Sequence, residues 1–129
     1  MANDKIQYWL DIATEDITVA ETLFNGGHWM YVAFMCHQAI EKTLKAYWCA
    51  IREDEPPYTH NHQRLADETG LTVQMSIEQK RFISMMLQMN IEARYPSYKS
   101  DISRRLTKES CAKIMEDTRE LLQWIQEKF

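Results

Sequence analysis

The sequence predicts an all-α protein: an antiparallel, up-and-down bundle of four long helices with a short fifth helix. Apolar side chains recur every three or four residues along most of the chain, and no segment alternates apolar and polar residues as a strand does. Glycine and proline fall in the short connections, where both residues end helices. A chain of 129 residues can build one core, so we expect a single domain over residues 1–129.

The first two predicted helices are joined by a glycine pair. We expect Asn3 to cap the first helix and Gly26-Gly27 to end it. The second helix is expected from Trp29 to Arg52, because Pro56-Pro57 prevents its continuation. The core face of the first helix is expected to hold Ile6, Trp9, Leu10, Ala13, Ile17, Ala20, Leu23 and Phe24.

The second helix is apolar on nearly three of its sides, whereas a surface helix normally has one apolar stripe. We therefore expect this helix in the middle of the bundle. One of its sides carries only small residues and is predicted to be available to a neighbouring helix or a second copy of the chain: Ala39, Thr43, Ala46 and Ala50. Its polar strip is narrow and consists of Gln38, Lys42 and Lys45.

Two polar residues, His37 and Glu41, lie on or beside the buried part of the second helix. Burying such groups without partners is costly. We therefore expect His37 and Glu41 to join Asp16 of the first helix in a buried polar network.

The second half of the chain contains weaker helix signals. Residues 58–71 are expected to be irregular, with one or two helical turns around Gln63 to Thr69. Ser76 and Gln79 form a potential capping box for a helix that carries Ile77, Phe82, Met86 and Leu87, with Ile91 left as an open alternative at its end. A loop is expected at 95–106, before a last helix capped by Thr107, whose core face holds Cys111, Ile114, Met115, Thr118, Leu121, Leu122 and Ile125.

Composition excludes several classes of function. A net charge of −4 argues against general DNA binding, and no apolar run has the length of a membrane span. Three widely spaced cysteines and the absence of a signal segment indicate a cytoplasmic protein. His60 and His62 offer two potential metal ligands without a third, and no phosphate-binding glycine loop occurs, so we expect neither a metal nor a cofactor.

Three segments resemble the signature motifs of the HEPN domain family, a nucleotide-binding domain of higher eukaryotes and prokaryotes: HQAIEKTLKAY at 37–47, PYTHNHQRL at 57–65 and ARYP at 93–96. The chain looks like a stand-alone prokaryotic member. The resemblance implies a bundle of four or five helices, commonly a homodimer, which often accompanies a minimal nucleotidyltransferase. Some relatives are ribonucleases of toxin–antitoxin systems.

The ribonucleases of this family carry an arginine followed four to six residues later by a histidine. This sequence departs from that pattern, because Arg94 is followed by Tyr95-Pro96-Ser97-Tyr98-Lys99-Ser100. Arg52 precedes His60 across the double proline, which is a different spacing and context. The departure argues against an enzyme, and we assign no catalytic residue.

The candidate ligand-binding residues are Lys42, Lys45, His60, His62, Arg94 and Tyr95. Each has a structural alternative: the lysines could be solvated, His60 could cap the turn at 62–65, Arg94 could pair with Asp16 or Glu41, and Tyr95 could pack on the bundle.

Three hypotheses follow from these residues. The leading one is a noncatalytic module that binds a nucleotide or another phosphate ligand, partnered by a nucleotidyltransferase in a toxin–antitoxin-like system. The second is a metal-independent ribonuclease toxin that uses His60 or His62 with Arg94. The third is a dimerisation or interaction module without a ligand, whose surface includes Trp29 and Tyr31.

Overall fold

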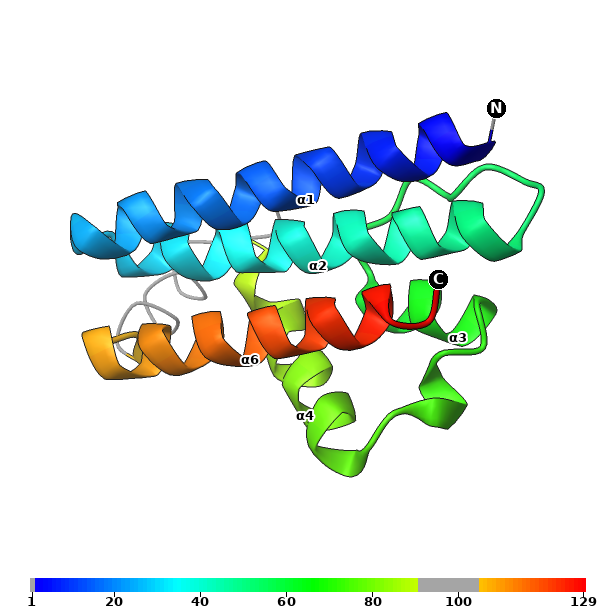
Figure 1. The fold of residues 1–129 in the computed structure, drawn as a ribbon. Coiled ribbons are helices and arrows are strands. Elements are labelled where there is room, and N and C mark those ends of the chain that lie inside the picture. The colour runs from blue at the N-terminus through cyan, green and yellow to red at the C-terminus, as the bar shows by residue number, and fades with distance from the viewer. Residues whose placement is uncertain (1, 91–104) are drawn as a thin grey trace.

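The computed structural model describes residues 2–90 and 105–129 (Figure 1). Within these ranges the chain forms the α-helices α1 (Ala2–Asn25), α2 (Trp29–Ile51), α3 (His62–Glu68), α4 (Ile77–Met86) and α6 (Lys108–Gln126), with short 3-10 turns η1 (Thr72–Gln74) and η2 (Leu87–Met89) and no strand. The prediction of an all-α bundle is confirmed. None of these helices has the length and apolar character needed to cross a membrane.

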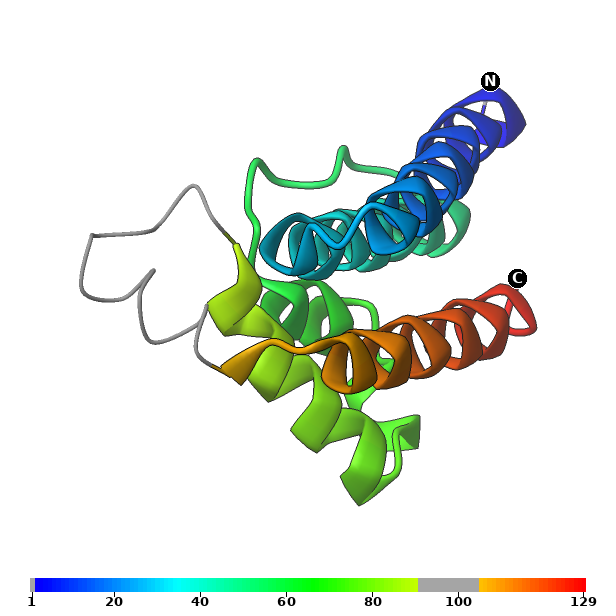
Figure 2. The same cartoon turned by 90° about the vertical axis from the view of Figure 1, so that its left-hand side faces the viewer.

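The three long helices form the body of the bundle. Helix α1 runs antiparallel to α2 along most of its length, and α6 lies along another side of α2 (Figure 1). Helix α4 ends at Met86, one residue before Leu87 of the expected helix, and it crosses α6 steeply (Figures 1 and 2). Ile91 lies outside the described residues. After η2 the backbone is extended at Asn90.

Helix α2 is the central element of the core, as its sequence predicts. Its large apolar residues Ile40 and Leu44 are completely buried. Its small-residue side packs on neighbouring helices, one of the two roles expected for it: Ala39, Thr43 and Ala46 are completely buried within the chain. Small side chains allow close approach between helices, and here the packing partners belong to the same chain. Ala50, the fourth residue of this side, lies near the end of α2 and is exposed.

Several helix termini follow from local sequence. Gly27 adopts φ +77°, the left-handed conformation in which glycine commonly ends a helix. Both side chains of the Ser76–Gln79 capping box make their hydrogen bonds. Thr107 caps α6 as expected and shares a second capping box with Ser110. Asn3, in contrast, lies inside α1, which begins at Ala2 rather than after a cap at Asn3.

Helix α6 presents the predicted core face. All seven of its expected core residues are buried, among them Cys111, Thr118 and Ile125. Helix α3 also forms where one or two turns were expected, and Gly70 follows it with φ +80°. Its cap is Asn61, whose side chain accepts a hydrogen bond from the Arg64 backbone, and not the neighbouring His60.

Candidate functional site

A buried carboxylate, Glu41 of α2, is the centre of a polar cluster. Its side chain is only 3% exposed. Glu41 Oε1 lies 2.7 Å from Nδ1 of His60. Glu41 Oε2 accepts a hydrogen bond from Lys45 Nζ at 3.0 Å and lies 3.5 Å from Lys42 Nζ. Three groups able to carry positive charge therefore surround one carboxylate.

Helical spacing brings the α2 members of this cluster together. Glu41 and Lys45 are four residues apart and so lie one turn apart on the same face. Lys42 is adjacent to Glu41, and its Nζ also donates to Gln38 Oε1 at 2.7 Å, one turn earlier. The polar strip Gln38–Lys42–Lys45 predicted from the sequence therefore makes hydrogen bonds within the protein and also forms part of its surface.

His60 reaches Glu41 because the segment after α2 folds back along that helix. Trp48 Nε1 donates to the Asp54 carbonyl at 3.0 Å, and the Arg52 guanidinium binds both carboxylate oxygens of Asp54. Arg52 also donates to the Glu68 carbonyl at the end of α3. These contacts tie residues 52–61 to α2 and α3, and they place His60 over Glu41.

The surroundings of Glu41 keep it ionised. Burial alone would raise the pKa of its carboxyl, but the hydrogen bond from His60 and the charges of Lys42 and Lys45 outweigh burial and lower the pKa. Glu41 therefore carries a negative charge at neutral pH. A charged, hydrogen-bonded carboxylate holds the His60 ring in one orientation.

Asp16 of α1 belongs to the same electrostatic environment. Burial raises the pKa of its carboxyl to about 6; the Lys42 charge opposes this shift and the Glu41 charge adds to it. Its Oδ2 atom is buried and has no hydrogen-bond partner among the described residues. Asp16 and Glu41 carry like charges, and their interaction is therefore repulsive.

His37 lies one turn before Glu41 on α2 and stacks on His62 of α3, with ring centroids 4.1 Å apart. Both side chains are buried, and His62 Nε2 donates to the His37 carbonyl at 2.9 Å. Burial lowers the pKa of His37 to about 4 and holds that of His62 well below its ordinary value. Both rings are therefore neutral at physiological pH.

The structure separates the six predicted ligand-binding residues into three groups. Lys42 and His60 reach the surface, with side chains 18% and 45% exposed. Lys45 and His62 lie in the interior: Lys45 Nζ contacts Glu41 and the face of Trp9, while His62 packs against His37. As placed, little of either side chain is open to a ligand at the surface. Arg94 and Tyr95 lie outside the described residues.

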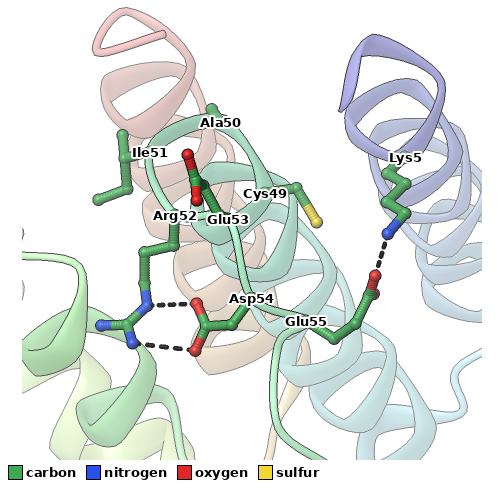
Figure 3. A pocket seen from close by; sticks show the side chains of 8 residues that line it. All are labelled: Lys5, Cys49, Ala50, Ile51, Arg52, Glu53, Asp54 and Glu55. Atoms are coloured by element: carbon green, nitrogen blue, oxygen red, sulfur yellow. Dashed lines mark hydrogen bonds and ion pairs between the residues drawn. The ribbon is translucent and has the colours of Figure 1, made fainter. Parts of the chain in front are cut away.

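A separate surface cavity of about 440 Å³ lies at the end of α2, about two turns from Glu41 (Figure 3). Four of the charged side chains that line it form pairs: Lys5 with Glu55, and Arg52 with Asp54. Burial is the largest influence on the Cys49 thiol at its edge and raises the pKa, which disfavours the reactive thiolate. We therefore read this cavity as a structural joint between α1 and the segment after α2.

The sequence did not reveal the contacts that three residues make at these sites. Trp9 was assigned to the core face alone, although its ring also contacts the Lys45 ammonium. Arg52 and Gln38 gave no local signal beyond helix position. Among the described residues, no group of three or more His, Cys, Asp or Glu side chains is arranged to hold a metal ion.

Comparison with known proteins places these features in a family. No curated protein matches the chain in sequence. The chain is similar in structure to the crystal structure of TT1696 from Thermus thermophilus, with a TM-score of 0.80 and 19% identity over 97% of this chain and 98% of that one. At this identity the likeness concerns the fold. The HEPN domain matches residues 6–128, and because that match spans nearly all of the sequence, the chain belongs to the HEPN domain family.

Proposed function

We propose that this protein is a noncatalytic HEPN domain that binds a nucleotide or another phosphate-bearing ligand at the surface formed by Lys42 and His60. One observation carries the proposal: these two side chains come from different segments and contact the same buried carboxylate, with Lys42 partly exposed and His60 exposed. A ligand at this surface would meet a fixed ammonium and a fixed imidazole, which are both established phosphate-binding groups.

The charge balance of the cluster is compatible with an anionic ligand. Lys42 and Lys45 together balance the charges of Glu41 and Asp16 at neutral pH, so the cluster itself presents no net negative charge to a phosphate. Lys45 satisfies Glu41 from within the bundle. Lys42 has three donor hydrogens, of which the contacts with Gln38 and Glu41 occupy two. The third can point toward a ligand oxygen.

Titration calorimetry with ATP, GTP and short single-stranded RNAs tests the proposal. We expect binding by the wild-type chain and a loss of about tenfold in affinity for Lys42→Gln and for His60→Gln, because a hydrogen bond to a charged group contributes about 1.5–3 kcal/mol. Lys113→Gln is the matched control, since Lys113 is an exposed α6 lysine paired with Asp117. Absence of heat with every ligand, or equal losses for Lys113→Gln and Lys42→Gln, would refute the proposed site.

A second candidate function is a metal-independent ribonuclease, favoured by the contact between His60 and Glu41 alone. A buried carboxylate bound to one imidazole nitrogen fixes the tautomer and orientation of that ring, as a general acid or base requires. The family's Arg–His ribonuclease pattern is absent from the sequence, which makes this the weaker proposal. Labelled RNA incubated with wild type and with Arg94→Ala/His60→Ala decides it: equal cleavage by both would identify a contaminant.

We also propose that the protein is a cytoplasmic homodimer and the partner of a minimal nucleotidyltransferase, in a toxin–antitoxin-like pair. Because Ala39, Thr43 and Ala46 of α2 are buried within the chain, we expect a dimer to use a surface such as the one around Tyr31, which is 46% exposed. Sedimentation of a monomer at micromolar concentration would exclude the dimer. A nucleotidyltransferase gene beside this one, and its co-purification with the chain, would support the partnership.

A further inference from the structure

Two neutral histidines form the contact between α2 and the start of α3. His37 is completely buried and His62 is 1% exposed, and their rings stack with an angle of 37° between the planes. In their buried positions neither ring can take part in the proposed ribonuclease reaction, and a ligand bound at the surface could not reach them. Histidines are uncommon in such an environment, because the charged form of the ring is strongly disfavoured by burial.

The hydrogen bonds of the two rings determine which ring nitrogen would have to bind an added proton. His62 Nε2 faces the His37 carbonyl, an acceptor, so this nitrogen carries the hydrogen of the neutral ring. A second proton would have to bind His62 Nδ1, which is buried without a partner among the described residues. Neither ring nitrogen of His37 has a hydrogen bond of normal geometry with those residues either. Protonation of His62 would therefore bury an N–H group without an acceptor among the described residues, and the backbone of His60 is the one group that favours a charged His37 by a hydrogen bond.

The surrounding charges do not offset that cost. Glu41 is the carboxylate that favours a charged His37, together with the backbone of His60, whereas His60 and Lys42 disfavour it through their charges. Glu41 is already bound by His60, Lys42 and Lys45. His62 is opposed by the charges of His37, His60 and Lys42, and only its backbone contact at His37 favours the charged form.

We propose that the stacked pair His37–His62 is a pH-sensitive latch, which holds α3 against α2 when both rings are neutral and releases α3 when one ring is protonated. Release would also free the segment that carries His60, because His60 and His62 flank the Asn61 cap of α3. The latch does not depend on what the His60 surface binds, so it stands or falls separately from the proposed ligand.

Local release is favoured by the small size of the element that the latch holds. Helix α3 has only seven residues, and its buried side chains besides His62 are Leu65 and Ala66. The α1–α2 and α2–α6 contacts extend over much longer helices and do not involve α3. Short elements with few buried apolar side chains open at lower free energy than the whole domain.

The size of the effect follows from His37. Its pKa is about 4 in the folded chain, against an ordinary value of 6.5, so an open state gains protons that the closed state lacks as the pH falls from 6.5 toward 4. For this one ring, the opening equilibrium rises about 30-fold between pH 8 and pH 5. Protonation of His62 acts in the same direction.

Native-state hydrogen exchange tests the latch on the intact chain. We expect amides bonded within and after α3, such as Leu65 and Leu71, to be less protected than α6 amides at both pH values. Their protection factors, corrected for the intrinsic pH dependence of exchange, should fall at least about 30-fold from pH 8 to pH 5. Equal protection of α3 and α6 would mean that α3 opens only in global unfolding, and a pH-independent α3 would exclude proton-linked release; either result overturns the latch.

The variant His37→Phe/His62→Gln provides the matched control. Phenylalanine keeps an aromatic ring at a position whose nitrogens make no hydrogen bond with the described residues, and glutamine can still donate to the backbone carbonyl of residue 37. In this variant the protection factors of the α3 amides should change by less than about threefold between pH 8 and pH 5. NMR titration of the histidine rings in the wild-type chain is a second test, which does not require the variant to fold. If His37 and His62 become protonated over the same pH range as the exposed His28, the proposal is overturned.

Discussion

Replacing Glu41 with glutamine should destabilise the protein by about 3 kcal/mol, because removing one partner of a buried ion pair leaves the other charge without compensation. The Lys45 side chain is 8% exposed and its Nζ lies 3.0 Å from Glu41 Oε2. In Glu41→Gln this ammonium would be buried beside Lys42 with no carboxylate to balance either lysine at that position. A neutral amide can accept one of the lost hydrogen bonds but carries no charge.

Urea unfolding followed by tryptophan fluorescence measures this loss, and a double-mutant cycle assigns its cause. Lys45→Met should cost only about 1 kcal/mol, because Glu41 keeps its contacts with Lys42 and His60. The double variant Glu41→Gln/Lys45→Met should lose less stability than Glu41→Gln alone, since no uncompensated charge remains at position 45. The reasoning is refuted if Glu41→Gln costs under about 1 kcal/mol at pH 7, or if the double variant is simply the sum of the two single variants.

The pH dependence of Glu41→Gln gives an additional check. The pKa of Glu41 is lowered in the folded chain, so its ionised form contributes stability above the ordinary glutamate value of 4.5, and that contribution is lost as the pH falls through the folded pKa. The difference between wild type and Glu41→Gln should therefore shrink in acid. A difference that stays constant from pH 7 to pH 3 would show that shape rather than charge is responsible.

Three further changes test other parts of the fold by the same unfolding assay. The pKa of Asp16 is raised to about 6, so its ionisation reduces the stability of the folded chain as the pH rises from about 4 to 6. Asp16→Asn should therefore stabilise the chain by about 1 kcal/mol at pH 8, after allowance for solvent screening, and should have no measurable effect at pH 4. Leu44→Ala should cost about 3 kcal/mol because Leu44 is completely buried, whereas Leu87→Ala, at a side chain 42% exposed, should cost under about 1 kcal/mol. Thr107→Ala removes the α6 cap and should cost about 1 kcal/mol, with loss of exchange protection confined to the first turn of α6.

Most of the helical layout could be predicted because its signals are local. The central position of α2 follows from apolar residues on nearly three of its sides, and the ends of α2 and α4 follow from a double proline and a capping box. The prediction of a cap at Asn3 was wrong because α1 begins at Ala2, two residues before the first helical residue that such a cap would give. The length of α4 failed because apolar residues continue past Met86 in the sequence, while the backbone becomes extended at Asn90.

The candidate site could be predicted only in part. Helical spacing alone places Glu41, Lys42 and Lys45 together. It does not reveal that His60 returns to Glu41 or that His62 stacks on His37, because these contacts join residues 19 and 25 positions apart. They depend on how the segment after α2 is anchored by Arg52 to Asp54 and to the end of α3.

The helical class, the family and the residues from which a site could be built can all be read from the sequence alone. Which of those residues reach the surface depends on tertiary packing: Lys42 and His60 do, whereas Lys45 and His62 are interior. Helix periodicity and capping act over a few residues, but exposure is set by what long-range packing places on each face. The same packing buried Ala39, Thr43 and Ala46 of α2 and turned two histidines into a contact between helices.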